Sequence, residues 1–405
     1  MEILPILRSL RRNKVGALLI ALQIAITLAV VSNCLSMIQH RVQWMQRPTG
    51  IDEANIFAMT NVWSSDPTDL KPLIEGDLAA LRALPGVIDA EATNNTPLGG
   101  QEWDWPLARG PDHEPFFAWS TIYSGDEHGL ATFGQKLLAG RWFTPDEVGE
   151  IRIRETKFPA VIVVTESVAD ALFPGGHALG QTLYFEHAGS SRIVGIVETM
   201  QRPGDAQGWG NPWREFSIFV PFQFVNNGLM YVVHTKPGQQ AAMLRAAPAR
   251  LLELTHERII GDLRTFSEIR RQAHRGNRTS IIILGVLSSL LLAVTAFGVI
   301  GLTMYWVGQR RRHIGMRRAL GARRVDILRY FQTENLLIAG TGCIVGVMLA
   351  MWGNTWLAAR LEISRMTVAY AGFGALILMV LCQLAVLWPA LRAAAVPPAI
   401  AIRGV

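Results

Sequence analysis

Residues 308–334, GQRRRHIGMRRALGARRVDILRYFQTE, carry eight arginines directly after a long apolar run. A guanidinium group keeps its charge at every physiological pH and donates paired hydrogen bonds to carboxylates and phosphates. The segment therefore suits three tasks: holding a loop in the cytoplasm beside a membrane, binding an anionic ligand, or contacting acidic groups of a partner protein.

Sequence motifs of an enzyme with its own active site are missing. The chain has no G-x-x-x-x-G-K-[ST] phosphate-binding loop and no G-x-S-x-G nucleophile elbow. HERII (256–260) lacks the second histidine of a zinc protease, and PLGGQ (97–101) lacks the serine of the ATPase signature LSGGQ. The nine histidines show no ligand spacing with the three cysteines. We therefore predict a non-catalytic chain that binds no metal or cofactor.

The composition indicates a membrane protein with a soluble insert. Half of the residues are hydrophobic, and charged residues make up 17%, against about 25% in soluble domains. The net charge of +6 is compatible with nucleic-acid binding, but the arginine clusters flank apolar runs. Orientation in a membrane is the simpler cause, so we do not predict a nucleic-acid partner.

Four apolar runs are long enough to cross about 30 Å of hydrocarbon as helices. They cover roughly 15–37, 280–307, 335–357 and 368–387. A cleaved signal peptide is the alternative for the first run, but the run is too long and no A-x-A site follows it. The third run contains several glycines, which predicts close packing against other helices.

Basic residues flanking these runs predict the topology, because cytoplasmic loops carry the excess of Lys and Arg. We expect both termini and the 308–334 segment in the cytoplasm, and a large domain inserted between helices 1 and 2 on the other side. The predicted division is a cytoplasmic N-terminal segment (1–14), either an amphipathic helix on the membrane surface or a simple basic flank, followed by TM1 (15–37), a two-lobed extracytoplasmic domain (38–279), TM2 (280–307), a cytoplasmic loop (308–334), TM3 (335–357), a short extracytoplasmic loop (358–367), TM4 (368–387) and a cytoplasmic tail (388–405).

The insert alternates between helical and strand patterns, which predicts an α+β domain. Helices are expected in 69–87, 165–175 and 238–255, and strands in 159–164, 181–187, 191–198 and 229–235. The stretch 99–120 is rich in Trp and Pro and is predicted to form a loop or an exposed lobe, and 202–216 is predicted to be another loop of that kind. Their tryptophans either anchor a partner or pack locally; these are Trp103, Trp105, Trp119, Trp209 and Trp213.

The segment 310–337 resembles the cytoplasmic loop of the permease superfamily that includes FtsX, the macrolide exporter MacB and the lipoprotein-releasing permeases. That loop has the pattern R-R-x-E-I-G-[IL]-x-[RK]-A-L-G-A, followed by a short helix and an acidic residue that opens the third membrane helix. The matching residues are Ile314, Gly315, Arg317, Arg318, Ala319, Leu320, Gly321, Ala322, Ile327, Leu328 and Glu334. The stretches 134–147 and 161–183 look like the MacB-type periplasmic core domain, and 388–403 resembles the family's C-terminal ending.

The resemblance implies an inner-membrane permease of the mechanotransmission type, four helices with the α+β domain between the first two. A separate cytoplasmic ATPase would bind ATP and Mg, and this chain would move with it. The expected partners are that ATPase, a second permease chain (identical or a paralogue), a periplasmic adaptor with an outer-membrane duct, and the lipid bilayer. The implied ATPase-coupling residues are Arg311, Arg312, His313, Gly315, Arg317, Arg318, Ala319, Leu320, Gly321 and Ala322.

Two functions remain open at this stage. The first is export or extrusion of a peptide, antibiotic, toxin or lipid-linked substrate. The second is FtsX-like signalling, in which ATP hydrolysis activates a periplasmic partner without transport. His313 stands where the family usually has Glu; either the partner surface differs, as in pairing with a non-identical permease, or the site is tolerant.

Overall fold

The computed structural model describes residues 14–64, 69–100, 102–108, 110, 116–152, 155, 157–185, 189–204, 213–361 and 366–395. For residues 311–313, 318 and 357–361 it describes the backbone alone. The chain forms two compact units, and the division falls at Met45 and Asn277. We call residues 45–277 the globular unit and the remainder the helical unit.

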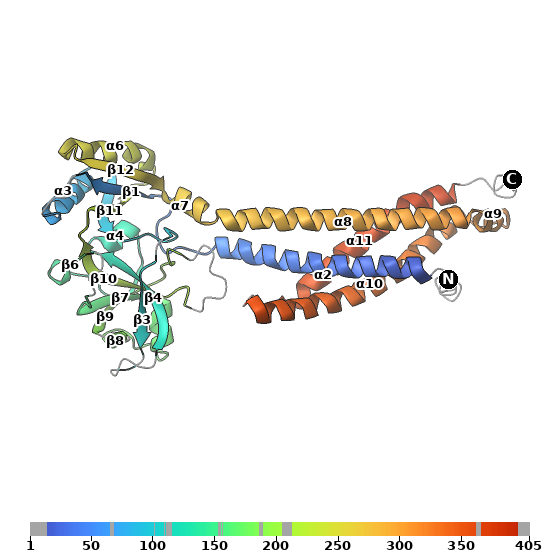
Figure 1. Ribbon diagram of the computed structural model, residues 1–405, viewed down its shortest axis with the longest axis horizontal. Coiled ribbons are helices and arrows are strands. Elements are labelled where there is room, and N and C mark those ends of the chain that lie inside the picture. Colours follow the sequence, from blue (N-terminus) through green and yellow to red (C-terminus); the bar gives the residue numbers. More distant parts are fainter. Residues whose placement is uncertain are drawn as a thin grey trace. The chain divides into compact units, whose positions relative to one another are not determined.

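Among its described residues, the helical unit contains four helices that are long and apolar enough to cross a membrane. They are α2 (Lys14–Met45), α8 (Arg275–Gln309), α10 (Arg324–Leu361) and α11 (Val368–Ala394), and the short helix α9 (Arg311–Ala319) lies between α8 and α10 in the chain (Figure 1). Each predicted apolar run lies within one of these helices. The chain is therefore a multi-pass membrane protein.

Small residues let α10 and α11 approach α2 closely. A Cβ atom at Gly342 would lie 2.8 Å from the Ala21 carbonyl oxygen, and one at Gly346 would lie 2.9 Å from the Leu28 Cβ. Backbone approach of this kind favours helix association where lipid gives no hydrophobic driving force. The glycines of the third run thus serve the close packing that the sequence predicts.

Side-chain hydrogen bonds also join the helices. Asn354 Nδ2 of α10 donates to Asn33 Oδ1 of α2 over 3.2 Å, and the Met366 amide donates to Asn354 Oδ1 over 2.7 Å. The Thr27 and Thr295 hydroxyls of α2 and α8 lie 2.8 Å apart. Polar side chains inside a bilayer need such partners.

The globular unit contains two sheets. The first is antiparallel, in the order β12–β1–β11–β2. The second has the order β4–β3–β8–β9–β7–β10–β6, with β5 on β9, and a further β4–β10 pairing closes six of these strands into a ring. The strands are β1 (Ile56–Trp63), β2 (Val87–Thr93), β3 (Asp104–Ala108), β4 (Phe116–Gly125), β5 (Leu137–Gly140), β6 (Gly149–Ile151), β7 (Val161–Thr165), β8 (Thr182–Phe185), β9 (Ser190–Val197), β10 (Ser217–Phe224), β11 (Gly228–Thr235) and β12 (Arg258–Thr265).

Five α-helices of this unit accompany the sheets, and a 3-10 turn covers Pro145–Glu147. The helices are α3 (Lys71–Arg82), α4 (Gly129–Phe133), α5 (Glu166–Leu172), α6 (Gln240–Leu254) and α7 (Phe266–Ala273). The four-stranded sheet has a core on both faces, because successive side chains of a strand point to opposite sides. Phe57 of β1 belongs to the core cluster that contains Ile74 of α3, whereas Ala58 belongs to the cluster that contains Tyr123 of β4.

Of the two alternatives for 99–120, the loop is wrong, because β3 and the first half of β4 lie there. Trp105 is buried and packs at 5.1 Å between ring centroids against both Phe158 and Phe185. Aromatic residues favour strands, and this preference outweighs the nearby Pro and Gly. Trp103 and Trp213 also pack against this core. Of the two alternatives for the tryptophans, Trp103, Trp105 and Trp213 therefore follow local packing. Trp119 of β4 is 40% exposed, and Trp209 lies outside the described residues.

Candidate functional site

The turn between α9 and α10 is a helix end of defined geometry. Gly321 has φ +99°, a conformation that residues with a Cβ rarely adopt. The Ala322 amide donates to the Arg317 carbonyl over 3.0 Å, and the Leu320 amide donates to the Met316 carbonyl over 3.0 Å. This six-to-one bond across a left-handed glycine is a Schellman motif. The Gly-Ala pair of the sequence therefore ends α9 at a fixed angle.

The start of α10 is also capped. The Arg323 amide donates to Asp326 Oδ2 over 3.0 Å, and the Asp326 amide donates to the Arg323 carbonyl over 3.1 Å. A carboxylate in the first turn satisfies a free backbone N–H and interacts favourably with the helix dipole. The two helices thus meet at a short, hydrogen-bonded corner.

A buried ion pair joins α10 to the junction of α8 and α9 at this corner. Arg310, between α8 and α9, directs Nη1 at both carboxylate oxygens of Glu334 on α10, over 3.1 and 2.9 Å. The Glu334 side chain is 2% exposed and the Arg310 side chain 19% exposed. The guanidinium also lies 5.8 Å from the Trp306 ring centroid. Arg310 is absent from the predicted coupling residues; its signal in the sequence was Glu334, one of two acids among eight arginines in 308–334.

The α9–α10 corner has one face buried in the helical unit and one exposed. Ile314 is 8% exposed and shares a core cluster with Ile327 and Phe331 of α10. On the other side Leu320 is 88% exposed, and the exposed Arg317 lies with its guanidinium 5.4 Å from the Tyr330 ring centroid. The geometry is that of a protruding corner rather than a pocket, and it suits contact with a protein groove.

The structure places the ten predicted coupling residues on α9 and the turn that follows it. Gly315 is buried, whereas Ala319, Leu320 and Gly321 are exposed. Ala322 is half-buried. The side chains of the remaining members, apart from Arg317, lie outside the described part of the chain; these are Arg311, Arg312, His313 and Arg318.

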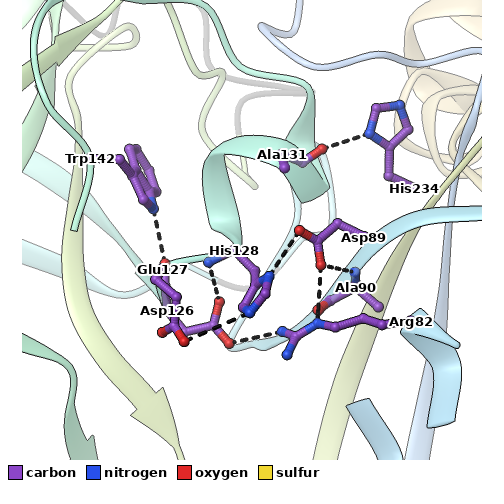
Figure 2. Close-up of polar contacts among 9 residues, drawn as sticks. All are labelled: Arg82, Asp89, Ala90, Asp126, Glu127, His128, Ala131, Trp142 and His234. Atoms are coloured by element: carbon purple, nitrogen blue, oxygen red, sulfur yellow. Dashed lines mark hydrogen bonds and ion pairs between the residues drawn. The ribbon is translucent and has the colours of Figure 1, made fainter. Parts of the chain in front are cut away.

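A polar cluster joins the two sheets of the globular unit (Figure 2). Arg82, at the end of α3, lies with Nε 3.0 Å from Asp89 Oδ1 on β2, and with Nη2 3.2 Å from Asp126 Oδ2 beyond β4. His128 Nδ1 lies 2.9 Å from Asp89 Oδ2. The Trp142 indole N–H donates to the Asp126 carbonyl over 2.9 Å. These contacts hold the ends of β2 and β4 together.

A buried carboxyl group near this cluster lacks a side-chain hydrogen-bond partner among the described residues. Glu91 of β2 is fully buried, and neither carboxylate oxygen has a hydrogen-bond partner among the described side chains. Burial raises the pKa of Glu91 well above its usual range, and the Asp126 carboxylate raises it further. Burial likewise raises the pKa of Asp126, against the Arg82 charge. A neutral Glu91 is thus the form that this core accommodates.

Within the described residues, no group of three or more His, Cys, Asp or Glu side chains is arranged to hold a metal ion. The three cysteines are buried in the helical unit and unpaired. Among the described residues, two features stand out by their polar geometry: the α9–α10 corner and the inter-sheet cluster.

Two known families match this chain, one in its N-terminal part and one in its C-terminal part. Residues 17–254 match the MacB-like periplasmic core domain, and residues 285–398 match the FtsX-like permease C-terminal domain. The periplasmic region of MacB from Actinobacillus actinomycetemcomitans is a structural neighbour at 17% identity and TM-score 0.33, covering 57% of this chain and 97% of that chain.

Curated relatives carry the description macrolide export ATP-binding/permease protein MacB. The protein from Aggregatibacter actinomycetemcomitans is 24% identical over 241 residues, which are 58% of this chain and 35% of the relative. That from Chlorobium luteolum is 28% identical, with 70% and 43% covered. That from Escherichia coli is 25% identical, with 74% and 44% covered. The chain spans less than half the length of these relatives.

Proposed function

Since the chain belongs to the FtsX-like permeases with a MacB-like periplasmic core domain, we propose that it is the permease subunit of an ABC-type complex. A separate cytoplasmic ATPase binds ATP and Mg and docks on the α9–α10 corner. The observation that supports this most directly is Leu320, which is 88% exposed on a turn held by hydrogen bonds on both sides. An apolar side chain presented on a rigid corner is a typical anchor for a pocket in a partner.

The α9–α10 corner would transmit a force from the docked ATPase to the membrane helices. Arg310 ties the junction of α8 and α9 to Glu334 of α10, so a force on α9 reaches two membrane helices together. In chain order α2 enters the globular unit and α8 leaves it. We place α9 and both termini in the cytoplasm and the globular unit in the periplasm. The Arg82–Asp89–Asp126–His128 cluster then keeps the two sheets moving as one body.

The proposed task is export or extrusion of a peptide, antibiotic, toxin or lipid-linked molecule. The relatives described as macrolide exporters favour this direction. The complex would contain a second permease chain, identical or a paralogue, and would use a periplasmic adaptor and an outer-membrane duct. Signalling of FtsX type, with activation of a periplasmic hydrolase and no cargo, is the alternative outcome of the test below.

The test is co-purification from native membranes in mild detergent, with mass spectrometry of the bound proteins. We expect Leu320→Asp and Arg317→Glu to lose an ATPase that the unmodified chain retains. The matched control is Arg392→Glu, an exposed arginine near the end of α11, which should keep the ATPase.

The other proteins recovered decide between transport and signalling. An adaptor recovered with the ATPase supports export, whereas a cell-wall hydrolase supports signalling. Equal ATPase recovery from all variants would refute docking on the α9–α10 corner.

A further inference from the structure

The chain enters the globular unit after α2 and leaves it through α7, and one side chain joins these two places. Arg270 of α7 donates Nη2 to the Met45 carbonyl over 2.5 Å and to the Arg47 carbonyl over 2.8 Å, and it donates Nη1 to the Glu53 carboxylate. These partners are 217 to 225 positions away in the sequence. We call the contacts of Arg270 with Met45, Arg47 and Glu53 the Arg270 clamp.

The contact with Met45 caps a helix. Met45 is the last residue of α2, and the last four carbonyls of an α-helix have no partner within that helix. A positive charge at this end also interacts favourably with the helix dipole. The last turn of α2 contains no basic residue of its own. Arg270 therefore brings both the donor and the charge to α2 from a distant part of the sequence.

The Glu53 carboxylate holds the guanidinium in its orientation. Glu53 Oε1 accepts a second hydrogen bond, from the Thr49 hydroxyl over 2.6 Å, and Thr49 is buried. The side chains of Arg270 and Glu53 are 22% and 30% exposed, so water screens the pair only in part. The planar guanidinium can bond a carboxylate and two carbonyls at once, which the single nitrogen of a lysine does less well.

The entry segment of the clamp is fixed to the globular unit. The Gln201 amide donates to the Thr49 carbonyl over 3.0 Å. A Cβ atom at Gly50, which has φ +88°, would lie 1.9 Å from the Thr199 carbonyl oxygen. The backbone of 49–50 therefore lies directly against the backbone of 199–201, an approach that needs glycine.

The exit helix α7 is fixed independently. Thr265 and Glu268 form a capping box at its start: the Glu268 amide donates to Thr265 Oγ1 over 3.3 Å, and the Thr265 amide donates to Glu268 Oε2 over 2.9 Å. Phe266 and Ile269 are buried in the core cluster that contains Tyr123 of β4. Arg270 thus extends from a helix that is already held by its cap and its core contacts.

The position of the clamp in the chain gives it a mechanical consequence. α7 ends at Ala273 and α8 begins at Arg275, so only His274 separates them. The clamp therefore joins the last residue of α2 to the helix that leads into α8. Without it, the link between these two places would depend on packing through the rest of the globular unit.

We propose that Arg270 is a positioning residue that holds the end of α2 at a fixed distance from α7, so that α2 and α8 displace the globular unit together. The purpose of the clamp rests on the proposed ATPase coupling. Its geometry does not, because all of its contacts lie within residues 45–277. Failure of the clamp and failure of the coupling are therefore separate results.

Pulsed electron paramagnetic resonance on the full chain in nanodiscs tests the clamp. Spin labels are attached at Gln46→Cys and Gln272→Cys, both exposed and both in the globular unit. The three buried native cysteines are replaced by alanine. The unmodified clamp should give one narrow distance distribution, identical without nucleotide and in the ATPase complex trapped with ATP and vanadate.

Arg270→Gln should broaden that distribution. Loss of hydrogen bonds from a charged group favours the detached form about tenfold or more, so the fraction of distances outside the narrow peak should rise by about that factor. Trapping with ATP and vanadate should now shift the distribution, a response that a purely structural residue would not produce. Arg271→Gln is the matched control, because its only ion pair among the described residues is an exposed contact with Glu268 at 3.8 Å.

Two conservative variants guard against a simple loss of folding. Arg270→Lys keeps the charge, and Glu53→Gln keeps the cap on α2, so both should broaden the distribution less than Arg270→Gln does. Circular dichroism of each variant confirms that the fold is retained.

Three results would overturn the proposal. They are a narrow distribution in Arg270→Gln, equal broadening in Arg271→Gln, or no effect of nucleotide on Arg270→Gln when the ATPase is bound. Recovery of the chain without any ATPase would count against the proposed function instead, and the nucleotide-free distances would still decide whether the clamp exists.

Discussion

Arg310 and Glu334 are separated by the whole of α9, yet one guanidinium nitrogen contacts both oxygens of the carboxylate. The pair joins the end of α8 to α10 at the point where α9 begins. A charge-assisted contact of this kind fixes orientation as well as distance. These two side chains thus help to fix the angle between α8 and α10 at the corner.

Breaking this pair should destabilise the helical unit. Glu334→Gln leaves Arg310 without its counter-charge, and loss of one member of a buried pair costs about 3–5 kcal/mol; we expect the lower end, because Arg310 is 19% exposed. The double variant Arg310→Met/Glu334→Met should lose less than either single variant. Thermal unfolding in detergent measures this, and additive losses would show that the two residues do not interact.

Gly321→Ala should reduce the coupling of this chain to the ATPase more than it lowers the stability of the fold. A Cβ in the left-handed region costs roughly 1–2 kcal/mol, and the relaxed turn would alter the angle between α9 and α10. The control is Gly308→Ala, whose Cβ would meet nothing within 4 Å and whose φ is ordinary. ATP hydrolysis by the reconstituted complex should fall several-fold for Gly321→Ala alone. Equal activity of both variants would remove the turn from the mechanism.

Glu91→Gln should flatten the pH dependence of unfolding. Burial raises the folded-state pKa of Glu91 above its ordinary value of 4.5. The stabilising contribution of this group is therefore complete below about pH 4.5 and is lost as the pH rises through the raised pKa. The variant should unfold at a higher temperature than the unmodified chain at pH 8, with a smaller difference at pH 5.

The exposed Glu75 supplies the control for that experiment. Glu75→Gln should leave the pH profile unchanged. A pH profile of Glu91→Gln that parallels the unmodified chain would mean that Glu91 is ionised in the folded state.

Replacing Trp105 of β3 should destabilise the fold much more than replacing Trp119 of β4. Trp105→Ala removes a ring packed against Phe158 and Phe185 and should cost about 3–5 kcal/mol, visible as a lower unfolding temperature. Trp119→Ala, at a 40% exposed ring, should cost less than about 1 kcal/mol. Similar losses at both sites would contradict the core assignment of Trp105.

Local sequence predicted many elements of the fold correctly. The segments around α3, α5 and α6, and those around β7, β9 and β11, follow the helical or strand patterns of their own residues, because periodicity and turn residues act over short distances. The loop prediction for 99–120 was wrong for the same reason, because it used only the local sequence. Its Pro and Gly signal a loop locally, whereas burial of Trp105 against residues 53 and 80 positions away is a long-range gain that no window of sequence contains.

The sequence by itself determined the four apolar helices, the placement of the inserted domain, the Gly-Ala break after α9 and the family. Each depends on the composition or order of neighbouring residues. Only the tertiary structure decided that Arg310 pairs with Glu334, that Glu91 is buried without a side-chain partner among the described residues, and that Trp105 packs against Phe158 and Phe185. These relationships join segments far apart in the chain, and their energies depend on burial and distance, which exist only once the chain has folded.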